Sequence, residues 1–226
     1  QNRRDFTINA LLITPSLQLL SFFGGLNDLK AGRVRFIRTP EEALKKDPGG
    51  ILRFFRFQAI FGKTPPDPEI LGTIKNNIEL LNEIPALFKQ AEFKKFLRTP
   101  KPYTMLQALH DHDILRCVLG FDVIDCLQIK NLERIESLVG KQSQPGVRLL
   151  LLVAQADIFP DQALAKLLEE WDFPETSRLM LTQLLNVLPE MNMDITQTQC
   201  YSLRKKMGRH FDSLVLLSWA MEQDIE

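Results

Sequence analysis

Two groups of charged residues near the start of the chain have the types and spacing that binding of an anionic ligand requires. The first group is Arg3, Arg4 and Asp5, which lead directly into the apolar run FTINALLI. Guanidinium groups bind anions through paired hydrogen bonds, and an apolar run of this kind is typical of a buried strand. We therefore expect the three charged side chains to lie at the edge of such a strand and to face an anionic ligand.

The second group lies in the segment KDPGGILRFFRF, residues 46–57. Positions 50, 53 and 56 are spaced by three, so Arg53 and Arg56 are expected to point roughly the same way from one helix. One interpretation is structural: Asp47 caps a helix that begins at Pro48, and the arginines are solvated. The other is that a carboxylate and a guanidinium on adjacent turns offer fixed acceptors and donors to the edge of a nucleotide base.

These residues carry a resemblance to a known family. The run RRDFTINAL resembles the ribose-recognition motif of the class II RNA nucleotidyltransferases, which comprise bacterial tRNA CCA-adding enzymes and poly(A) polymerases. The segments GGLNDLKAG and RVRFI resemble the next segments of the same family, and the rest of the chain has the expected helical order. The resemblance implies nucleotide binding by the motif residues Arg3, Arg4, Asp5 and Asn9, with the first three near the ribose and the triphosphate.

The family carries the pattern E-D-x-x-R-x-L-R-x-x-R-F where this chain has residues 46–57. In that pattern the Asp and the first Arg read the Watson–Crick edge of CTP or ATP, so the resemblance implies Asp47 at the base and Arg53 and Arg56 toward phosphate. The chain departs from the pattern at Lys46, in place of Glu, and at Gly50, in place of the base-reading Arg. We therefore expect poor discrimination of CTP and ATP from UTP and GTP, and better discrimination in the variant Gly50→Arg.

Nucleotidyl transfer also needs carboxylates that hold two divalent metal ions. The family supplies them from a D-x-D pair ahead of the RRD motif, whereas this chain begins at Gln1. We interpret the sequence as a fragment or one half of a split protein. We expect no catalytic or metal-holding residue within it, Mg²⁺ held by a preceding head segment, and no nucleotide transfer by the chain alone. The one D-x-D of the chain, Asp111-His112-Asp113, falls between predicted helices and is not expected to hold a metal.

Four cations near the C-terminus form a candidate RNA contact. Tyr201, His210 and Phe211 lie close to them in the sequence, and the combination suits an RNA backbone. The stretch also resembles the tail of the bacterial family members. The alternative is a helix end whose cations interact favourably with its last carbonyl groups before Gly208. We predict RNA as the partner, through the 3′ end of a tRNA, with contacts from Arg204, Lys205, Lys206 and Arg209.

Turn and cap signals predict the elements that position these residues. Apolar stretches at 11–14 and 17–22, separated by Pro15 and Ser16, predict two short strands with a tight turn, and 33–37 predicts a basic strand. Residues 39–42 form a capping box, after which prolines punctuate a helical pattern. The expected helices are 48–61, 67–83, 86–98, 103–111, 121–139, 146–158, 161–171, 175–187, 196–207 and 210–222.

The predicted fold class is mainly α: an elongated multi-helix body with a short antiparallel β-sheet remnant at the N-terminus. Its predicted domains are the C-terminal part of a nucleotidyltransferase head (1–38), a neck with the nucleotide-template helix (39–112), and a helical body and tail (113–226).

Composition sets limits on function. With 45% hydrophobic and 25% charged residues, the sequence is typical of an ordinary globular protein. Residues 1–61 carry ten Lys or Arg and five Asp or Glu, a basic end suited to a polyanion. Three scattered cysteines favour reduced thiols over disulfides or a zinc site. No run approaches the ~20 apolar residues of a membrane span. We therefore expect a cytoplasmic protein without membrane contact.

Three functions stay open from the sequence. The resemblance favours CCA addition to tRNA from CTP and ATP, and poly(A) synthesis shares the same motifs. A noncatalytic RNA-binding derivative of the family is favoured by Gly50 and by the lack of metal-holding carboxylates.

Overall fold

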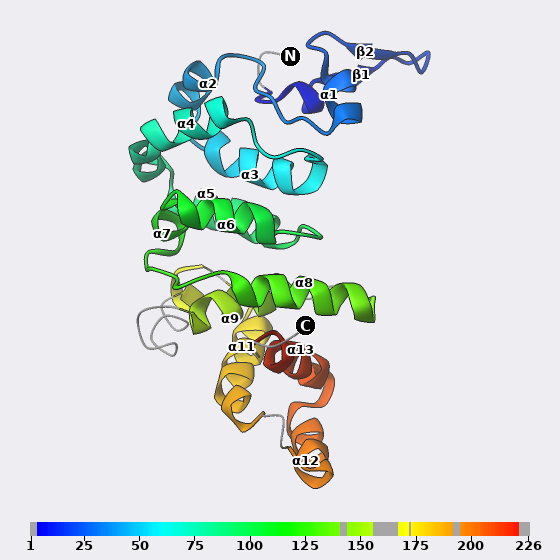
Figure 1. Ribbon diagram of the computed structural model, residues 1–226, viewed down its shortest axis with the longest axis vertical. Coiled ribbons are helices and arrows are strands. Elements are labelled where there is room, and N and C mark those ends of the chain that lie inside the picture. Colours follow the sequence, from blue (N-terminus) through cyan, green and yellow to red (C-terminus); the bar gives the residue numbers. More distant parts are fainter. Residues whose placement is uncertain (1–3, 141–143, 156–166, 172, 192–194, 222–226) are drawn as a thin grey trace. The chain divides into compact units, whose positions relative to one another are not determined.

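The computed structural model describes residues 4–140, 144–155, 167–171, 173–191 and 195–221. The chain divides into two compact units, unit 1 (Gln1–Lys101) and unit 2 (Pro102–Glu226). It is mainly helical, with a small antiparallel sheet near the N-terminus (Figure 1), so the predicted mainly α class with a short antiparallel sheet is confirmed. The predicted domain boundaries after residues 38 and 112 stay a prediction.

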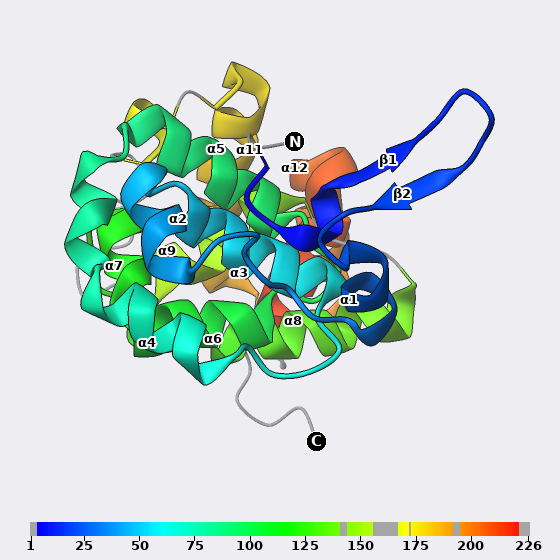
Figure 2. The same cartoon turned by 90° about the horizontal axis from the view of Figure 1, so that it is seen from above.

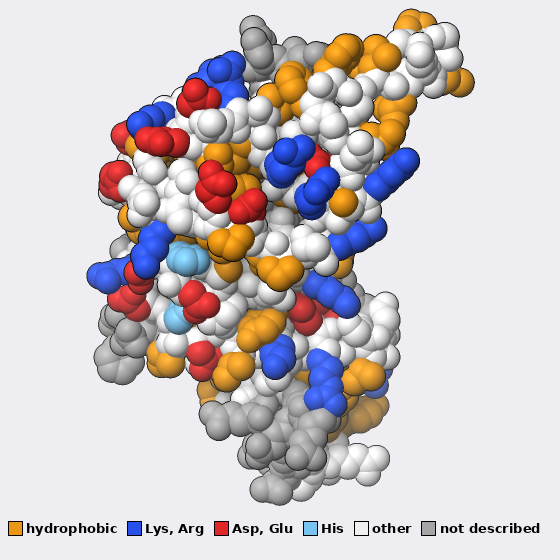
Figure 3. Space-filling model, turned by 45° about the horizontal axis from the view of Figure 1, so that its top comes forward, with side chains coloured by type: hydrophobic (Ala, Val, Ile, Leu, Met, Phe, Trp, Pro, Cys, Tyr) orange, Lys and Arg blue, Asp and Glu red, His pale blue; other side chains and the backbone are white. Residues whose placement is uncertain are grey.

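The sheet has two strands, β1 (Leu11–Ile13) and β2 (Leu19–Ser21), in the register Leu12↔Leu20. Both strands were expected. The two strands form a hairpin that projects from the helices of unit 1 (Figure 2), and apolar side chains lie along it (Figure 3). The hairpin exposes large apolar residues, namely Leu12, Ile13, Leu17, Leu19 and Phe22. It therefore presents an apolar surface that is unusual for a free hairpin.

The basic strand expected at 33–37 is wrong, because it forms only the isolated bridge Phe6↔Phe36. The 3₁₀ turn η1 (Thr7–Asn9) bends the chain away immediately after Phe6, which leaves too short a partner for a ladder. Two backbone hydrogen bonds still join the segments, from Thr7 N to Arg35 O at 3.0 Å and from Ile37 N to Asp5 O at 2.9 Å. Asp5 is thereby fixed by backbone contacts.

The remaining elements of unit 1 are helical and build its core. Proline and a side-chain cap begin two of them: Thr39 Oγ1 accepts from Glu42 N before Pro40, and Asp67 accepts from Glu69 N before Pro68. The elements are α1 (Gly25–Ala31), α2 (Pro40–Lys46), α3 (Gly50–Phe61), α4 (Pro68–Asn76), η2 (Ile78–Glu83) and α5 (Ala86–Leu97).

Helix α3 is held in place by aromatic packing. The ring of Phe36 lies 4.7 Å from Phe6 and 6.0 Å from Phe54, between ring centroids. Phe6 and Phe54 are fully buried, so the bridge at Phe6 and the helix share one core. Burial of each such ring contributes roughly 1.5–3 kcal/mol relative to an exposed ring. This cluster fixes the start of the chain against α3.

Unit 2 is all helical over its described residues. Its elements are α6 (Tyr103–Asp111), α7 (Ile114–Leu119), α8 (Leu127–Val139), α9 (Pro145–Ala154), α11 (Glu175–Val187), η3 (Leu188–Glu190), α12 (Gln197–Met207), η4 (Gly208–His210) and α13 (Phe211–Met221). The helix expected at 121–139 is wrong in its first turns. Gly120, with φ of 81°, ends α7, and α8 begins only at Leu127. Most of the helix expected at 161–171 lies outside the described residues.

Helix length and polarity bear on membrane insertion. No helix among the described residues is both long enough and apolar enough to cross a bilayer.

Candidate functional site

Asp5, Arg53 and Asp47 form one connected group, although 48 positions separate the first two in sequence. Arg53 Nε donates to Asp5 Oδ2 at 2.6 Å, and Arg53 Nη2 donates to Asp47 Oδ2 at 2.7 Å. The exposed fractions of the side chains are 15% for Arg53, 24% for Asp5 and 54% for Asp47. Asp5 is therefore the more buried carboxylate of the group, and Asp47 is the one that a ligand can reach.

Local structure places Asp47 at the junction of two helices. It is the C-terminal cap of α2, and its Oδ1 accepts from Gly49 N at 3.0 Å. We expected Asp47 to cap a helix starting at Pro48, but α3 begins at Gly50 with Gly49 as its N-cap. The carboxylate instead stabilises the short connection between α2 and α3 through Gly49 N, and its second oxygen accepts from Arg53.

The charges of this group keep Arg53 ionised. Burial by itself would lower the pKa of Arg53, but the hydrogen bond to Asp47 and the charges of Asp5 and Asp47 raise it on balance. Two carboxylates thus share one guanidinium, and the group as a whole carries one excess negative charge. Asp47, as its exposed member, can accept hydrogen bonds from a ligand while its position is fixed by Arg53 and Gly49.

A hollow lies beside Asp47, and Phe88 of α5 forms part of its wall. The Arg53 guanidinium carbon lies 5.5 Å from the centroid of the Phe88 ring, which supports the guanidinium from one side. A Cβ at Gly49 would stand 2.6 Å from the same ring, so only glycine fits without displacing it. The hollow is lined by Asp47, Pro48, Gly49, Glu83, Ile84, Pro85 and Phe88. The sequence did not predict that Phe88 belongs to the site. The glycine pair at 49 and 50 was the one feature that indicated a close neighbour there.

The predicted stripe of positions 50, 53 and 56 does not form a common face. Gly50 is buried, and a Cβ there would meet Leu44 Cδ2 at 3.4 Å and Phe36 Cε1 at 3.5 Å. Steps of three residues fall about 60° short of a full turn each, so the direction rotates by roughly 120° between positions 50 and 56. An arginine at position 50 would begin in the apolar core. The effect of Gly50→Arg on base discrimination stays a prediction.

Arg56 lies in a different environment from Arg53. Its Nε donates to Glu92 Oε2 of α5 at 2.9 Å, and its guanidinium carbon lies 4.6 Å from the centroid of the Phe57 ring. Glu92 is buried and also accepts from Lys95 Nζ at 2.7 Å. Burial would raise the pKa of Glu92, but Lys95 and Arg56 lower it on balance. Arg56 therefore pairs with Glu92 of α5, whereas Arg53 pairs with Asp5 and Asp47.

The remaining residues of the N-terminal motif have distinct positions. Arg4 is exposed, and Arg3 lies outside the described residues. Asn9 Oδ1 accepts from Phe6 N at 3.3 Å and so closes the turn η1. Asn9 therefore shapes the backbone immediately after Asp5.

The four predicted RNA-contacting cations lie at the end of α12 and in η4. Arg204 and Lys205 are exposed, whereas Lys206 Nζ pairs with Glu190 Oε1 at 2.6 Å. Arg209 Nε donates to His210 Nε2 at 3.2 Å. The pKa of His210 is lowered by burial and by the charge of Arg209, which keeps its ring neutral and able to accept this bond.

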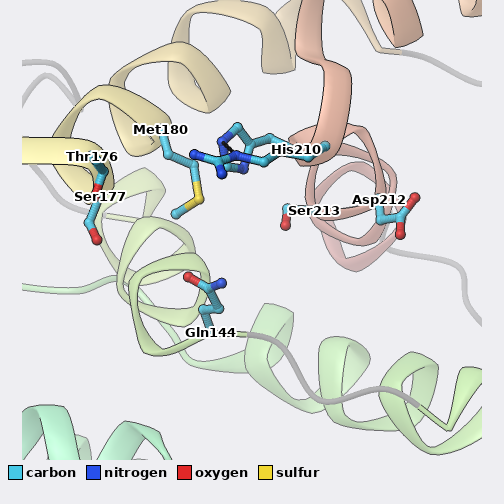
Figure 4. Close-up of a pocket in the computed structure, with 8 residues that line it drawn as sticks. Gln144, Thr176, Ser177, Met180, His210, Asp212 and Ser213 are labelled. Carbon is cyan, nitrogen blue, oxygen red and sulfur yellow. Dashed lines mark hydrogen bonds between the residues drawn. The ribbon is translucent and has the colours of Figure 1, made fainter.

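Arg209 and His210 line a polar cavity in unit 2 (Figure 4). Thr176, Ser177 and Met180 of α11 lie on one side of it, and Asp212 and Ser213 of α13 lie on another, with Gln144 below them in the view. Lys206 and Arg209 thus have separate partners, whereas Arg204 and Lys205 are exposed.

The residues present do not fit the Mg²⁺ that the family resemblance implies. Asp5 and Asp47 each give an oxygen to the Arg53 guanidinium, which stands where a shared cation would be held. Within the described ranges, no group of three or more His, Cys, Asp and Glu side chains is arranged to bind a metal ion. In the D-x-D sequence of unit 2, Asp111 accepts from Gln107 Nε2 at 2.8 Å.

Comparison with known proteins gives consistent matches. Residues 1–35 match the family described as poly A polymerase head domain. The chain is 31% identical over 162 residues to poly(A) polymerase I of Salmonella typhimurium, covering 70% of this chain and 34% of that protein. It is 34% identical over 119 residues to the CCA-adding enzyme of Bacillus subtilis, covering 53% of this chain and 30% of that protein. The chain spans about a third of the length of these curated relatives.

Solved structures match over nearly the whole chain. A tRNA-processing enzyme complex aligns with a TM-score of 0.75 and 25% identity, over 98% of this chain and 63% of that one. The CCA-adding enzyme of Bacillus stearothermophilus in complex with CTP aligns with a TM-score of 0.71 and 20% identity, over 95% of this chain and 53% of that one. The second likeness is one of fold.

Proposed function

Because the chain belongs to the class II nucleotidyltransferase family of CCA-adding enzymes and poly(A) polymerases, and covers part of such an enzyme, we propose that it forms the nucleotide-template and RNA-binding part of a CCA-adding tRNA nucleotidyltransferase. In this proposal CMP and AMP pass from CTP and ATP to the 3′ end of a tRNA. The carboxylates that hold Mg²⁺ belong to a head segment other than the residues described above.

The connection from Asp5 through Arg53 to Asp47 supports this proposal. It joins the RRD motif to the start of α3, and it leaves Asp47 open beside a hollow. In the proposed complex Arg3, Arg4 and Asp5 lie near the ribose and triphosphate, and Asp47 accepts hydrogen bonds from the base edge. Arg53 holds Asp47 in position and takes the place of the arginine that the family pattern has at position 50. Arg56 mainly joins α3 to α5, because its guanidinium is bound by Glu92 of α5.

The test is nucleotide transfer by the chain with and without a head. The chain would be incubated with labelled CTP or ATP, Mg²⁺ and a tRNA that lacks its CCA end. A parallel reaction would contain the separately expressed head of the Bacillus subtilis relative. We expect incorporation only in the completed reaction, since transfer needs metal-holding carboxylates. Incorporation by the chain alone would contradict the proposed division of labour.

Asp47 provides the residue-level test in the completed reaction. Asp47→Asn turns one acceptor into a donor at the base edge, and a lost bidentate contact changes base discrimination by about 1–3 kcal/mol. We expect a roughly five- to hundredfold loss of selectivity for CTP and ATP. Lys45→Gln is the matched control, because Lys45 is exposed and pairs with Glu41 one turn away. Equal selectivity in the two variants would remove Asp47 from the base-reading role.

A poly(A) polymerase is the alternative, because relatives of both kinds match at similar identity. The product distinguishes them: addition that stops after two C and one A supports the CCA-adding type, and long runs of A support the poly(A) type. RNA binding by a completed protein without any incorporation would support a noncatalytic derivative.

A further inference from the structure

A second pocket in unit 1 lies toward the opposite end of α3 from Asp47. Gln58 of its lining follows Gly50 by eight residues, which is about 12 Å along the helix axis. The pocket has a volume of about 360 Å³, within the range of sites for small ligands. It is lined by Arg33, Val34, Arg35, Gln58, Thr64, Pro65, Pro66, Asp67 and Pro68.

One buried carboxylate orients both arginines of this pocket. Asp28 Oδ2 accepts from Arg35 Nε at 3.0 Å and Nη2 at 2.8 Å, and from Thr7 Oγ1 at 2.7 Å. Arg33 Nη2 lies 3.2 Å from the other oxygen, Asp28 Oδ1. The arginine side chains are still 55% and 51% exposed, for Arg33 and Arg35. Arg33 and Arg35 share the one anion Asp28, so they keep donors for a ligand. Asp67 adds a second carboxylate to the lining, and its Oδ1 accepts from Glu69 N at 2.9 Å.

The Asp28 carboxylate is ionised at neutral pH. Burial would raise the pKa of Asp28, but hydrogen bonds from Arg35 and Thr7 and the charges of Arg35 and Arg33 lower it on balance. The two guanidiniums are thus held by a permanent charge beneath them, which fixes their orientation before a ligand arrives.

The part of the pocket formed by Gln58 and residues 64–68 is held by close contacts. Gln58 Nε2 donates to Thr64 O at 2.6 Å, and Lys63 N donates to Gly32 O at 3.0 Å. Gly32 has φ of 66°, and a Cβ there would lie 2.4 Å from Lys63 Cγ, so the two segments touch closely. Prolines 65, 66 and 68 fix their own φ angles. A preformed pocket needs little ordering when a ligand binds.

We propose that Arg33 and Arg35, with this proline-lined wall, bind one phosphate group of an RNA strand. The guanidiniums meet the phosphate through paired hydrogen bonds, and the flat proline wall receives the adjoining sugar or base. Lys63 precedes Thr64 of the lining and adds a positive charge to this segment, and its Nζ donates to Lys30 O at 3.4 Å. The inference rests on the proposed function, because it takes RNA as the ligand.

Arg33 is the residue to change, because Arg35 carries two of the hydrogen bonds that satisfy buried Asp28. The full chain would be titrated with a fluorescently labelled single-stranded RNA at several salt concentrations, as wild type and as Arg33→Gln. Each phosphate contact contributes about 0.7 to the slope of log K against log salt for a single strand. We expect Arg33→Gln to reduce the slope by about this amount and the affinity by about fivefold at 0.1 M salt.

Two further variants control the measurement. Arg33→Lys keeps the charge but loses the planar fork, so it should keep the slope and lose part of the affinity. Lys75→Gln removes an exposed cation from the last turn of α4, outside the pocket lining, and should change the slope less. Circular dichroism of each variant checks folding. Unchanged affinity and slope in folded Arg33→Gln would overturn the site.

A competition arm identifies the source of the phosphate. Displacement of labelled RNA by unlabelled RNA, but not by millimolar ATP or pyrophosphate, is the expected result. Binding of ATP that depends on Arg33, without RNA binding that depends on it, would assign the pocket to a nucleotide and overturn the RNA site. A wild-type chain that binds no RNA would count against the proposed function itself. RNA binding that is insensitive to Arg33 would count against this site alone.

Discussion

The contact of Arg53 with Asp5 and Asp47 permits a quantitative test of the candidate site. Arg53→Gln removes both charge-assisted hydrogen bonds. The bond to Asp5 lies between groups that are 15% and 24% exposed, and such bonds contribute about 1.5–3 kcal/mol. The bond to Asp47 reaches a group that is 54% exposed, and exposed ion pairs contribute about 0.2–1 kcal/mol. We expect Arg53→Gln to lower the free energy of unfolding of unit 1 by about 2–3 kcal/mol.

A double-mutant cycle separates the two partners. Combining Arg53→Gln with Asp5→Asn should give a coupling energy of at least about 1.5 kcal/mol, and combining it with Asp47→Asn should give less than about 1 kcal/mol. Lys45→Gln is the control, because its pair with Glu41 is exposed at both ends and such pairs contribute about 0.3–0.5 kcal/mol. An equal or larger coupling with Asp47 would refute the inference that the sheltered Asp5 contact dominates.

The positions of the fluorescent residues allow the effect to be assigned to one unit. Both tryptophans, Trp171 and Trp219, and both tyrosines, Tyr103 and Tyr201, belong to unit 2. Intrinsic fluorescence during urea unfolding therefore reports on unit 2, whereas hydrogen exchange of peptides from α3 reports on unit 1. We expect Arg53→Gln to reduce protection in α3 and to leave the fluorescence transition in place. Equal shifts in both signals would show that the contact does not act locally.

Three other predictions concern neighbouring residues. Gly49→Ala should destabilise the protein by about 1–2 kcal/mol, because its Cβ would stand 2.6 Å from Phe88. Gly50→Ala should be neutral or stabilise by up to about 1 kcal/mol, whereas Gly50→Arg should destabilise strongly because it places a charge in the core. Thermal unfolding ranks the three variants. Arg56→Gln should cost about 1–3 kcal/mol because buried Glu92 keeps only Lys95, and adding Glu92→Gln should recover part of that loss in urea titrations. The pKa of Asp28 is lowered in the folded chain, so its ionised form contributes fully to stability above pH ~4. That contribution declines as the pH falls through the pKa of the folded state. Asp28→Asn should therefore flatten the pH dependence of the free energy of unfolding between about pH 5 and 2.

Local signals in the sequence determined most of the secondary structure. Prolines and capping side chains act within one turn of a helix, so α6 and α11 begin and end where they were expected, and α2 begins at its predicted cap. The strand pair β1 and β2 follows from two apolar stretches around a short turn. The same local reach explains two of the errors in secondary structure. The helix expected from residue 121 begins only at Leu127, after Gly120 has ended α7, and the turn η1 removed the partner of the expected third strand.

The partners of the charged side chains were decided only by the tertiary structure. The sequence singled out Asp5, Asp47, Arg53 and Arg56 by their types and by a resemblance, but spacing along a helix cannot say which element packs against it. The packing of α5 against α3 gave Glu92 to Arg56 and Phe88 to Arg53, and the aromatic core turned Gly50 inward. The contacts of Arg53 and Arg56 with α5 join residues more than thirty positions apart. They form because burial of apolar rings fixes the helices, and each polar group then pairs with a partner within reach.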